Sequence, residues 1–145
     1  MRYLGVDIGK KRTGLAISDP TGLIARPLEV VAGGADAAAL GRALRPIVER
    51  EEVEGLVVGL PRRMGGEEGP EAVHARAVGV HLARAFGLPV EMWDERLSTV
   101  EATDRLIEAG LSREEREDQV DKVAAALILQ DFLDSRHGPV LEPAP

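Results

Sequence analysis

The stretch from Leu4 to Ser18 places the strongest constraint on how this chain folds. Two apolar runs are separated by Gly9, three consecutive basic residues and Gly14, a pattern that predicts a β-hairpin. Asp7 lies inside the first run, where a strand normally carries an apolar residue. Because an unpaired buried carboxylate is costly, Asp7 is expected to be paired, hydrogen-bonded or metal-bound. Two interpretations stay open from this stretch: a metal ligand of a phosphoryl-transfer site, or a side chain that caps the nearby turn.

Length and composition indicate one globular domain. The chain has 145 residues, of which 44% are hydrophobic and 30% charged, as in ordinary folded domains. The absence of cysteine excludes disulfides and thiolate metal sites. No apolar stretch approaches the ~18–20 residues of a membrane span, and the first residues lead straight into a strand, so a cytoplasmic protein without membrane contact is expected. The net charge of −7 argues against non-specific coating of nucleic acid but leaves room for a local basic groove.

The order of expected elements is three strands followed by alternating helices and strands. Strands are expected at 3–8, 14–18, 23–31, 55–60 and 90–94, and helices at 36–52, 70–86, 98–110 and 117–135. The first three strands are joined too closely to be anything but antiparallel neighbours, whereas the wholly apolar run 55–60 indicates a central parallel strand. The predicted fold is α/β, a five-stranded mixed sheet with three antiparallel and two parallel strands, flanked by helices. One domain is predicted over 1–136, with a flexible tail at 137–145.

Several acidic residues are expected to gather at one edge of this sheet. In open α/β sheets, ligands bind beyond the carboxyl ends of parallel strands. Asp7 lies near the end of the first strand, and Asp94 and Glu95 close the fifth. Asp121 shares a face of the last helix with three apolar residues and is expected to point toward the sheet, with Asp118 one turn earlier. The alternative for both helical acids is a first-turn position favoured by the helix dipole.

Three carboxylates from the first strand, the fifth strand and a late helix would suit Mg²⁺ or Mn²⁺, since hard cations take oxygen ligands. Two such ions about 3.5–4 Å apart stabilise the attacking and leaving oxygens of phosphodiester hydrolysis. Nearby basic side chains could hold the phosphate backbone; the candidates are Lys11, Arg62, Arg63 and Arg96. For the Arg62–Arg63 pair, a solvated loop is an equal alternative. The three histidines lack the spacing of a metal signature.

Four blocks of the sequence carry a resemblance to a known family: Asp7–Ala16, Val58–Gly65, Asp94–Ala102 and Asp121–Leu129. In these blocks the chain resembles the YqgF/RuvX family, whose members are described as pre-16S rRNA nucleases and as Holliday-junction resolvase-like proteins. The resemblance implies an RNase H-like fold. It also implies a metal-dependent nuclease that acts on structured nucleic acid, with processing of the 5′ end of 16S rRNA as its role in ribosome biogenesis.

The resemblance also implies a set of site residues. Carried over by position, they are the acids Asp7, Glu95 and Asp121 and the basic residues Lys11 and Arg96, with two Mg²⁺ or Mn²⁺ ions. Related resolvases take their second acid from the end of the fourth strand, where this chain has Val57-Val-Gly-Leu60, so the acid must come from the fifth strand. Alternation puts Asp94 and Glu95 on opposite faces; the motif favours Glu95, with Asp94 as the substitute.

Other functions remain open at this stage. One is a Holliday-junction resolvase in DNA recombination and repair, and another is a non-catalytic nucleic-acid-binding assembly factor. A nucleotide-binding protein of the sugar-kinase and actin type also opens with an Asp-x-Gly hairpin, but needs a second domain for which 145 residues leave no room. The sequence does not decide between rRNA precursor and branched DNA as partner, or between monomer and homodimer.

Overall fold

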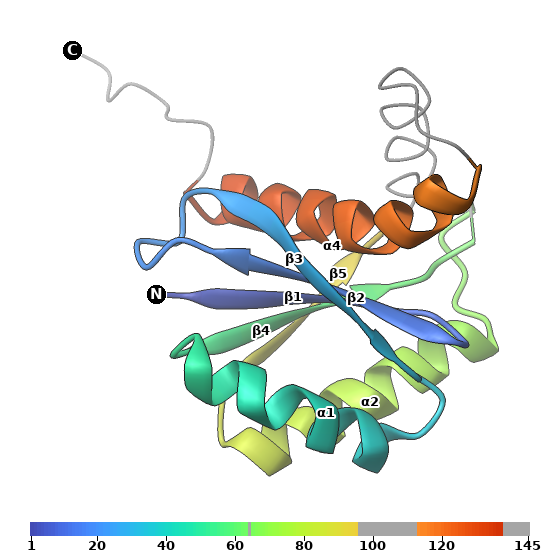
Figure 1. Ribbon diagram of the computed structural model, residues 1–145. Helices are drawn as coiled ribbons and strands as arrows, with labels where there is room; N and C mark the ends of the chain where they lie inside the picture. Colours follow the sequence, from blue (N-terminus) through green and yellow to red (C-terminus); the bar gives the residue numbers. More distant parts are fainter. Residues whose placement is uncertain (64, 96–112, 138–145) are drawn as a thin grey trace.

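The computed structural model describes residues 1–63, 65–95 and 113–137 (Figure 1). Its strands are β1 (Tyr3–Ile8), β2 (Arg12–Ser18), β3 (Ala25–Ala32), β4 (Gly55–Leu60) and β5 (Val90–Asp94). Its helices are α1 (Ala37–Arg50), α2 (Pro70–Phe86) and α4 (Arg113–His137). The helix expected at 98–110 and most of the expected tail lie outside the described residues.

The five strands form one sheet in the order β3-β2-β1-β4-β5. The three strands β1, β2 and β3 are antiparallel neighbours, while β4 is parallel to β1 and β5 is parallel to β4. This topology confirms the predicted mixed sheet. Every residue of β4 is buried, as the wholly apolar run predicts for a central strand.

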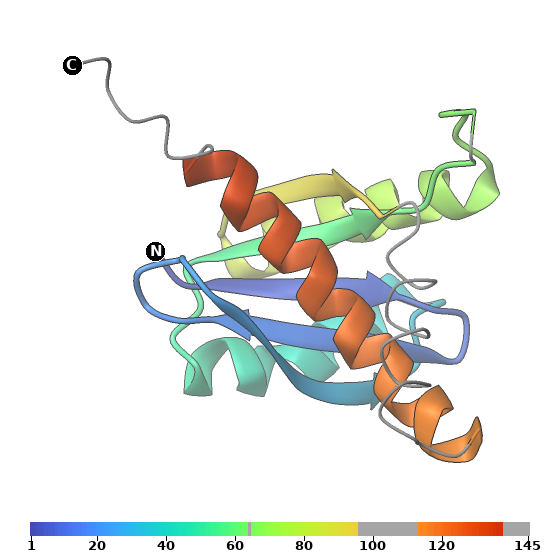
Figure 2. The same ribbon diagram turned by 90° about the horizontal axis from the view of Figure 1, so that it is seen from above.

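Helices cover both faces of the sheet, with α1 and α2 on one face and α4 on the other (Figures 1 and 2). Successive side chains of β1 alternate between these layers. Leu4 and Val6 belong to the core cluster shared with α1 and α2, whereas Tyr3 packs with α4 and meets the Phe132 ring edge-on at 5.2 Å. The same alternation directs Asp7 toward the α4 side. No helix in the described part of the chain is long and apolar enough to cross a membrane.

Local signals in the sequence fix the ends of the helices. Asp36 caps α1 by accepting hydrogen bonds from the backbone N–H groups of Ala38 and Ala39, a role that aspartate often has at the first position of a helix. Pro70 opens α2, and Gly87 ends it in the left-handed conformation at φ 64°. The start of β3 differs from the prediction, because the backbone before Ala25 is held in a turn by the side chain of Asp19.

Candidate active site

The carboxyl ends of β1 and β5 bring two acids together. Both strands are parallel neighbours of β4, so their ends lie at the same edge of the sheet. Asp7 precedes the last residue of β1, and Glu95 follows β5, where its backbone N–H donates to the carbonyl oxygen of Leu60 at 3.2 Å. The side chains of Asp7 and Glu95 are hydrogen-bonded to each other. Residues 88 positions apart in the chain therefore form one carboxyl pair.

Gly59 explains why Glu95, rather than Asp94, reaches this site. Trp93 packs into the α4-side cluster, so alternation turns Asp94 away from that side and brings Glu95 back to it. A Cβ atom on Gly59 would lie only 2.2 Å from Oε2 of Glu95. The glutamate carboxyl thus occupies the space that the missing side chain of Gly59 leaves free. The geometry favours Glu95 as the acid from the fifth strand.

Asp121 approaches the same edge from α4. A Cβ atom on Gly14 would lie 2.0 Å from the carbonyl oxygen of Asp121, so only glycine lets the helix lie this close to β2. The carboxylate of Asp121 interacts electrostatically with Asp7, and its Oδ2 lies 3.0 Å from Nε of Arg12. The residues predicted to share the helical face of Asp121 are all buried: Ala124, Ala125 and Ile128.

Burial, and to a smaller extent the charges of neighbouring acids, make both paired acids hard to ionise. Desolvation raises the pKa of Asp7 to about 6; the hydrogen bond with Glu95 opposes this rise, and the charge of Asp121 adds to it. Desolvation also raises the pKa of Glu95 to about 9, helped by the charge of Asp7 and by their shared hydrogen bond. Near neutral pH, Glu95 is therefore the protonated member and donates to Asp7.

The Asp7–Glu95 pair has the chemistry of a divalent-cation site. Oε2 of Glu95 is buried and has no hydrogen-bond partner among the described residues. An oxygen left in this way beside a second carboxyl fits Mg²⁺, which usually takes one or two carboxylates and several waters. Within the described ranges, no three His, Cys, Asp or Glu side chains are arranged to bind one ion. The inclusion of Asp121 as a third ligand therefore stays a prediction.

A basic turn borders the acids. Gly9, Lys10, Lys11, Arg12 and Asp121 line a cavity of about 470 Å³. Lys10 and Lys11 are exposed there, whereas Arg12 is half-buried. The turn places Lys11 beside the acidic edge, where the sequence predicts a contact with phosphate.

The other predicted basic residues differ from one another. Arg62 is half-buried, and its Nη2 lies 3.4 Å from Glu68, which Arg76 also binds at 2.7 Å. Arg62 is thus part of an ion-pair network rather than of a freely solvated loop, while Arg63 is exposed. Arg96 and the side chain of Asp118 lie outside the described part of the chain.

Two contributors were missed by the sequence reasoning, Arg12 and Gly59. Arg12 is one of three consecutive basic residues, and nothing in their spacing indicates which of them turns toward Asp121. Gly59 carried a readable signal: the fourth strand lacks an acid where related resolvases have one, and a glycine lies near that strand end. A missing side chain there implies room for a group from a neighbouring strand.

The chain is similar to known proteins over nearly its whole length. A family model described as "RuvX: Holliday junction resolvase" matches residues 1–135. A protein of Pelotomaculum thermopropionicum is 49% identical over 139 residues, covering 96% of this chain and 90% of that protein. A protein of Anaeromyxobacter sp. is 51% identical over 140 residues, covering 94% and 99%. Both are named "Putative pre-16S rRNA nuclease".

Solved structures share the fold at low sequence identity. The structure titled "T. thermophilus RuvC in complex with Holliday junction substrate" matches with a TM-score of 0.56 and 18% identity, covering 95% of this chain and 96% of that one. The fowlpox virus Holliday junction resolvase matches with a TM-score of 0.53 and 14% identity, covering 94% and 99%. These likenesses concern the fold alone, and they confirm the predicted RNase H-like architecture.

Proposed function

The chain belongs to the RuvX family, and we propose that it is a nuclease that hydrolyses phosphodiester bonds at the carboxyl ends of β1 and β5 with the help of Mg²⁺ or Mn²⁺. The observation that carries the proposal is the Asp7–Glu95 pair, in which a buried carboxyl oxygen that finds no hydrogen-bond partner in the described part of the chain lies beside a second acid. One shared proton, which leaves the pair with a single negative charge, is one way to stabilise two buried carboxyl groups at this distance. Exchange of that proton for a divalent cation is the other.

Each residue of the site has a proposed role. Asp7 and Glu95 hold the cations, and Asp121 joins them as the third acid of a two-ion site. Bound there, the ions would polarise the scissile phosphate and activate the attacking water. Arg12 positions the carboxylate of Asp121 through the contact of 3.0 Å. Lys11 holds the phosphate backbone as it approaches the edge of the sheet.

We propose precursor 16S rRNA, in the cytoplasm, as the substrate. This rests on the names of the relatives that are 49% and 51% identical to the chain. A four-way DNA junction is the second candidate, because the matching family model is described as a Holliday junction resolvase. The two substrates make different demands on assembly, since a cutter of symmetric junctions benefits from a two-fold dimer and an RNA-processing enzyme has no such need.

A cleavage panel tests this function. Wild type and Asp7→Asn are incubated with a precursor 16S rRNA fragment, a four-way DNA junction and a linear duplex, each with Mn²⁺ or with EDTA. We expect wild type to cut the rRNA at its 5′ end with Mn²⁺ only, and Asp7→Asn to remain folded and inactive. Undiminished cleavage by Asp7→Asn would refute the site. Cleavage of the junction without cleavage of rRNA would identify the four-way DNA junction as the substrate. Tight binding without any cleavage would indicate a non-catalytic assembly factor.

A further inference from the structure

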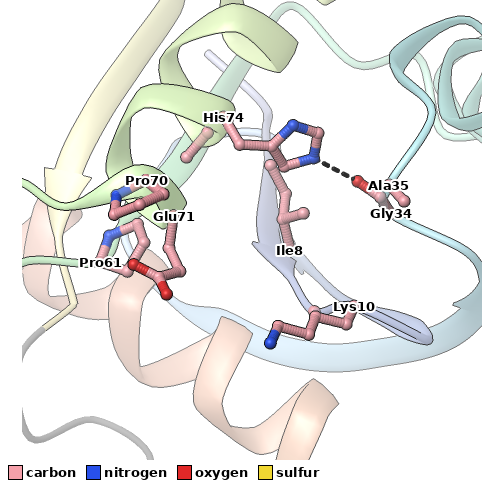
Figure 3. A pocket seen from close by; sticks show the side chains of 10 residues that line it. Ile8, Lys10, Gly34, Ala35, Pro61, Pro70, Glu71 and His74 are labelled. Atoms are coloured by element: carbon pink, nitrogen blue, oxygen red, sulfur yellow. Dashed lines mark hydrogen bonds between the residues drawn. The ribbon is translucent and has the colours of Figure 1, made fainter.

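A pocket lies beside the acidic edge, on the other side of the sheet (Figure 3). Ile8 follows Asp7 in β1 and therefore faces the opposite way, where it forms part of the pocket wall. The volume is about 380 Å³, within the range of small-molecule sites. The walls come from the β1–β2 turn, the loop before α1, the loop after β4 and the first turns of α2; they include Ile8, Lys10, Ala35, Pro61, Glu71 and His74.

The chemistry of these walls suits a flat ring with a polar edge. Most of the lining is apolar, with Ile8 and Pro61 among its members. Nε2 of His74 donates a hydrogen bond to the carbonyl oxygen of Gly34 at 2.7 Å, which fixes the ring against the wall. Lys10 and Glu71 extend toward each other from opposite walls (Figure 3). A lysine ammonium can donate to a ring nitrogen or carbonyl, and a carboxylate can accept from an amino group.

The pocket borders the site of the proposed reaction. Gly9 and Lys10 line both this pocket and the cavity that contains Arg12 and Asp121. A nucleic-acid strand that crosses the β1–β2 turn would therefore meet the acids on one side of the sheet and the pocket on the other. Lys10 lines both cavities, and it has no ion-pair partner within the described ranges.

We propose that this pocket binds one unpaired nucleobase of the substrate strand, next to the phosphate that is cleaved. This inference rests on the nuclease function proposed above and adds a specificity site to it. The base lies against the apolar wall, its polar edge meets Lys10 and Glu71, and the backbone passes over the β1–β2 turn. Proteins recognise RNA mainly through unstacked single-stranded bases of this kind, and enzymes that take a base out of its stack hold it in an enclosed pocket. The site then requires an unpaired nucleotide near the cut.

Fluorescence of 2-aminopurine tests the proposal, because this base brightens when it leaves a stack. A precursor 16S rRNA fragment is prepared with 2-aminopurine at one position at a time, scanned along its whole length. Binding is measured with Ca²⁺ and cleavage with Mn²⁺. Ala35→Phe fills the pocket from one wall, and Glu71→Phe fills it from the other. Ala39→Phe is the matched control, since Ala39 is equally exposed on α1 and does not line the pocket.

We expect one position to brighten severalfold with wild type and with Ala39→Phe, and to stay dim with both pocket variants, whose thermal unfolding shows that they are folded. Cleavage of the same fragment should fall at least tenfold in the two pocket variants. The proposal is overturned if no position distinguishes the pocket variants from the control while all of them bind the RNA. Brightening without Mn²⁺-dependent cleavage by wild type would keep the pocket and refute the nuclease. Equal cleavage by all variants, without brightening, would keep the nuclease and refute the pocket.

Discussion

The two ends of the sheet treat their acidic residues in opposite ways. Beyond β2, at the end of the sheet where β1 begins, Asp19 accepts hydrogen bonds from the hydroxyl of Thr21 and from the backbone N–H groups of Ile24 and Leu23. These donors hold the pKa of Asp19 well below its usual range. At the other end, burial raises the pKa of Asp7 to about 6, with a smaller contribution from the charge of Asp121. Burial, followed by the charge of Asp7, raises the pKa of Glu95 to about 9.

This difference separates a structural carboxylate from a functional one. Donors within the chain fill the hydrogen-bonding capacity of the Asp19 carboxylate, so this residue stabilises a turn without any ligand. The Asp7–Glu95 pair retains a buried oxygen without a hydrogen-bond partner among the described residues. This oxygen is available to coordinate a cation. A fold that keeps such a pair gives up stability for function, as active sites commonly do.

The largest effect is expected from Gly59→Ala, which changes only the end of the sheet that carries Asp7 and Glu95. The new Cβ would lie 2.2 Å from Oε2 of Glu95 and 3.0 Å from Cδ1 of Ile128. Both atoms end flexible side chains, so Glu95 should swing away while the sheet stays intact. Cleavage should fall by about two orders of magnitude or more, in line with the loss of several kcal/mol of metal-assisted stabilisation. Single-turnover cleavage of rRNA measures this loss.

Gly41→Ala is the matched control for that variant. Its Cβ would lie 3.4 Å from the His81 ring, which is an ordinary contact. Alanine is also more favourable than glycine in the interior of a helix such as α1. Cleavage by Gly41→Ala should equal that of wild type. Full activity in Gly59→Ala would mean that Glu95 is not required at this position.

The next effect is on stability and tests the raised pKa of Glu95, which comes first from burial and then from the charge of Asp7. For Glu95, the folded-state pKa of about 9 exceeds the ordinary value of 4.5. The folded state therefore binds more protons, and wild type loses stability as pH rises from about 4.5 to about 9. Glu95→Gln carries no charge and escapes this loss. Without metal, the variant should be more stable than wild type by about 1–3 kcal/mol near pH 9 and equally stable near pH 4, as measured by urea unfolding. An advantage that does not depend on pH would argue against this origin.

At the other end of the sheet, Asp19→Ala should lower stability without touching function. The change removes the acceptor for the backbone N–H groups of Leu23 and Ile24, each donated at 2.8 Å. Thermal unfolding should occur at a lower temperature, while cleavage at a temperature where the variant is folded should match wild type. If Asp19→Ala lost cleavage while its unfolding temperature stayed unchanged, Asp19 would be a functional residue and the difference between the two ends of the sheet would be contradicted.

The smallest effect is expected from Lys11→Ala. A contact with phosphate is screened by salt, so the variant should bind rRNA more weakly at low ionic strength and almost normally at high ionic strength. The slope of log affinity against log salt should fall by about one unit. Arg26→Ala is the comparison, because Arg26 is exposed at the end of β3 that pairs with Ile17, away from the acids. If Lys11→Ala and Arg26→Ala give the same slope of log affinity against log salt, Lys11 does not contact the RNA backbone.

Local signals made most of the fold predictable from the sequence. The cap at Asp36, the proline at position 70 and the glycine at position 87 each act through their own backbone geometry, so the helix ends follow from a few neighbouring residues. The central, buried position of β4 follows from its wholly apolar sequence. The antiparallel pairing of the first three strands follows from their short connections. The start of β3 was wrong because the Asp19 turn extends the loop through Ile24.

The site was predictable only in part, because its contacts join distant parts of the chain. Alternation allowed only one of Asp94 and Glu95 to face the site, and the family motif led to Glu95. Helical spacing led to the inward face of Asp121. The Arg12–Asp121 pair, the space above Gly59 and the pocket beside His74 depend on packing between elements. No periodic pattern within a single element reports such packing.

Calorimetric titration of Mn²⁺ into the metal-free protein tests the central claim, that Asp7 and Glu95 together hold a divalent cation. At neutral pH, Glu95 must lose its proton to bind the ion, so titrations in two buffers of different ionisation heat should show about one proton released per site. Binding should be lost in the double variant Asp7→Asn, Glu95→Gln and unchanged in Asp19→Ala. Failure of wild type to bind Mn²⁺, or equal binding by the double variant, would contradict the account.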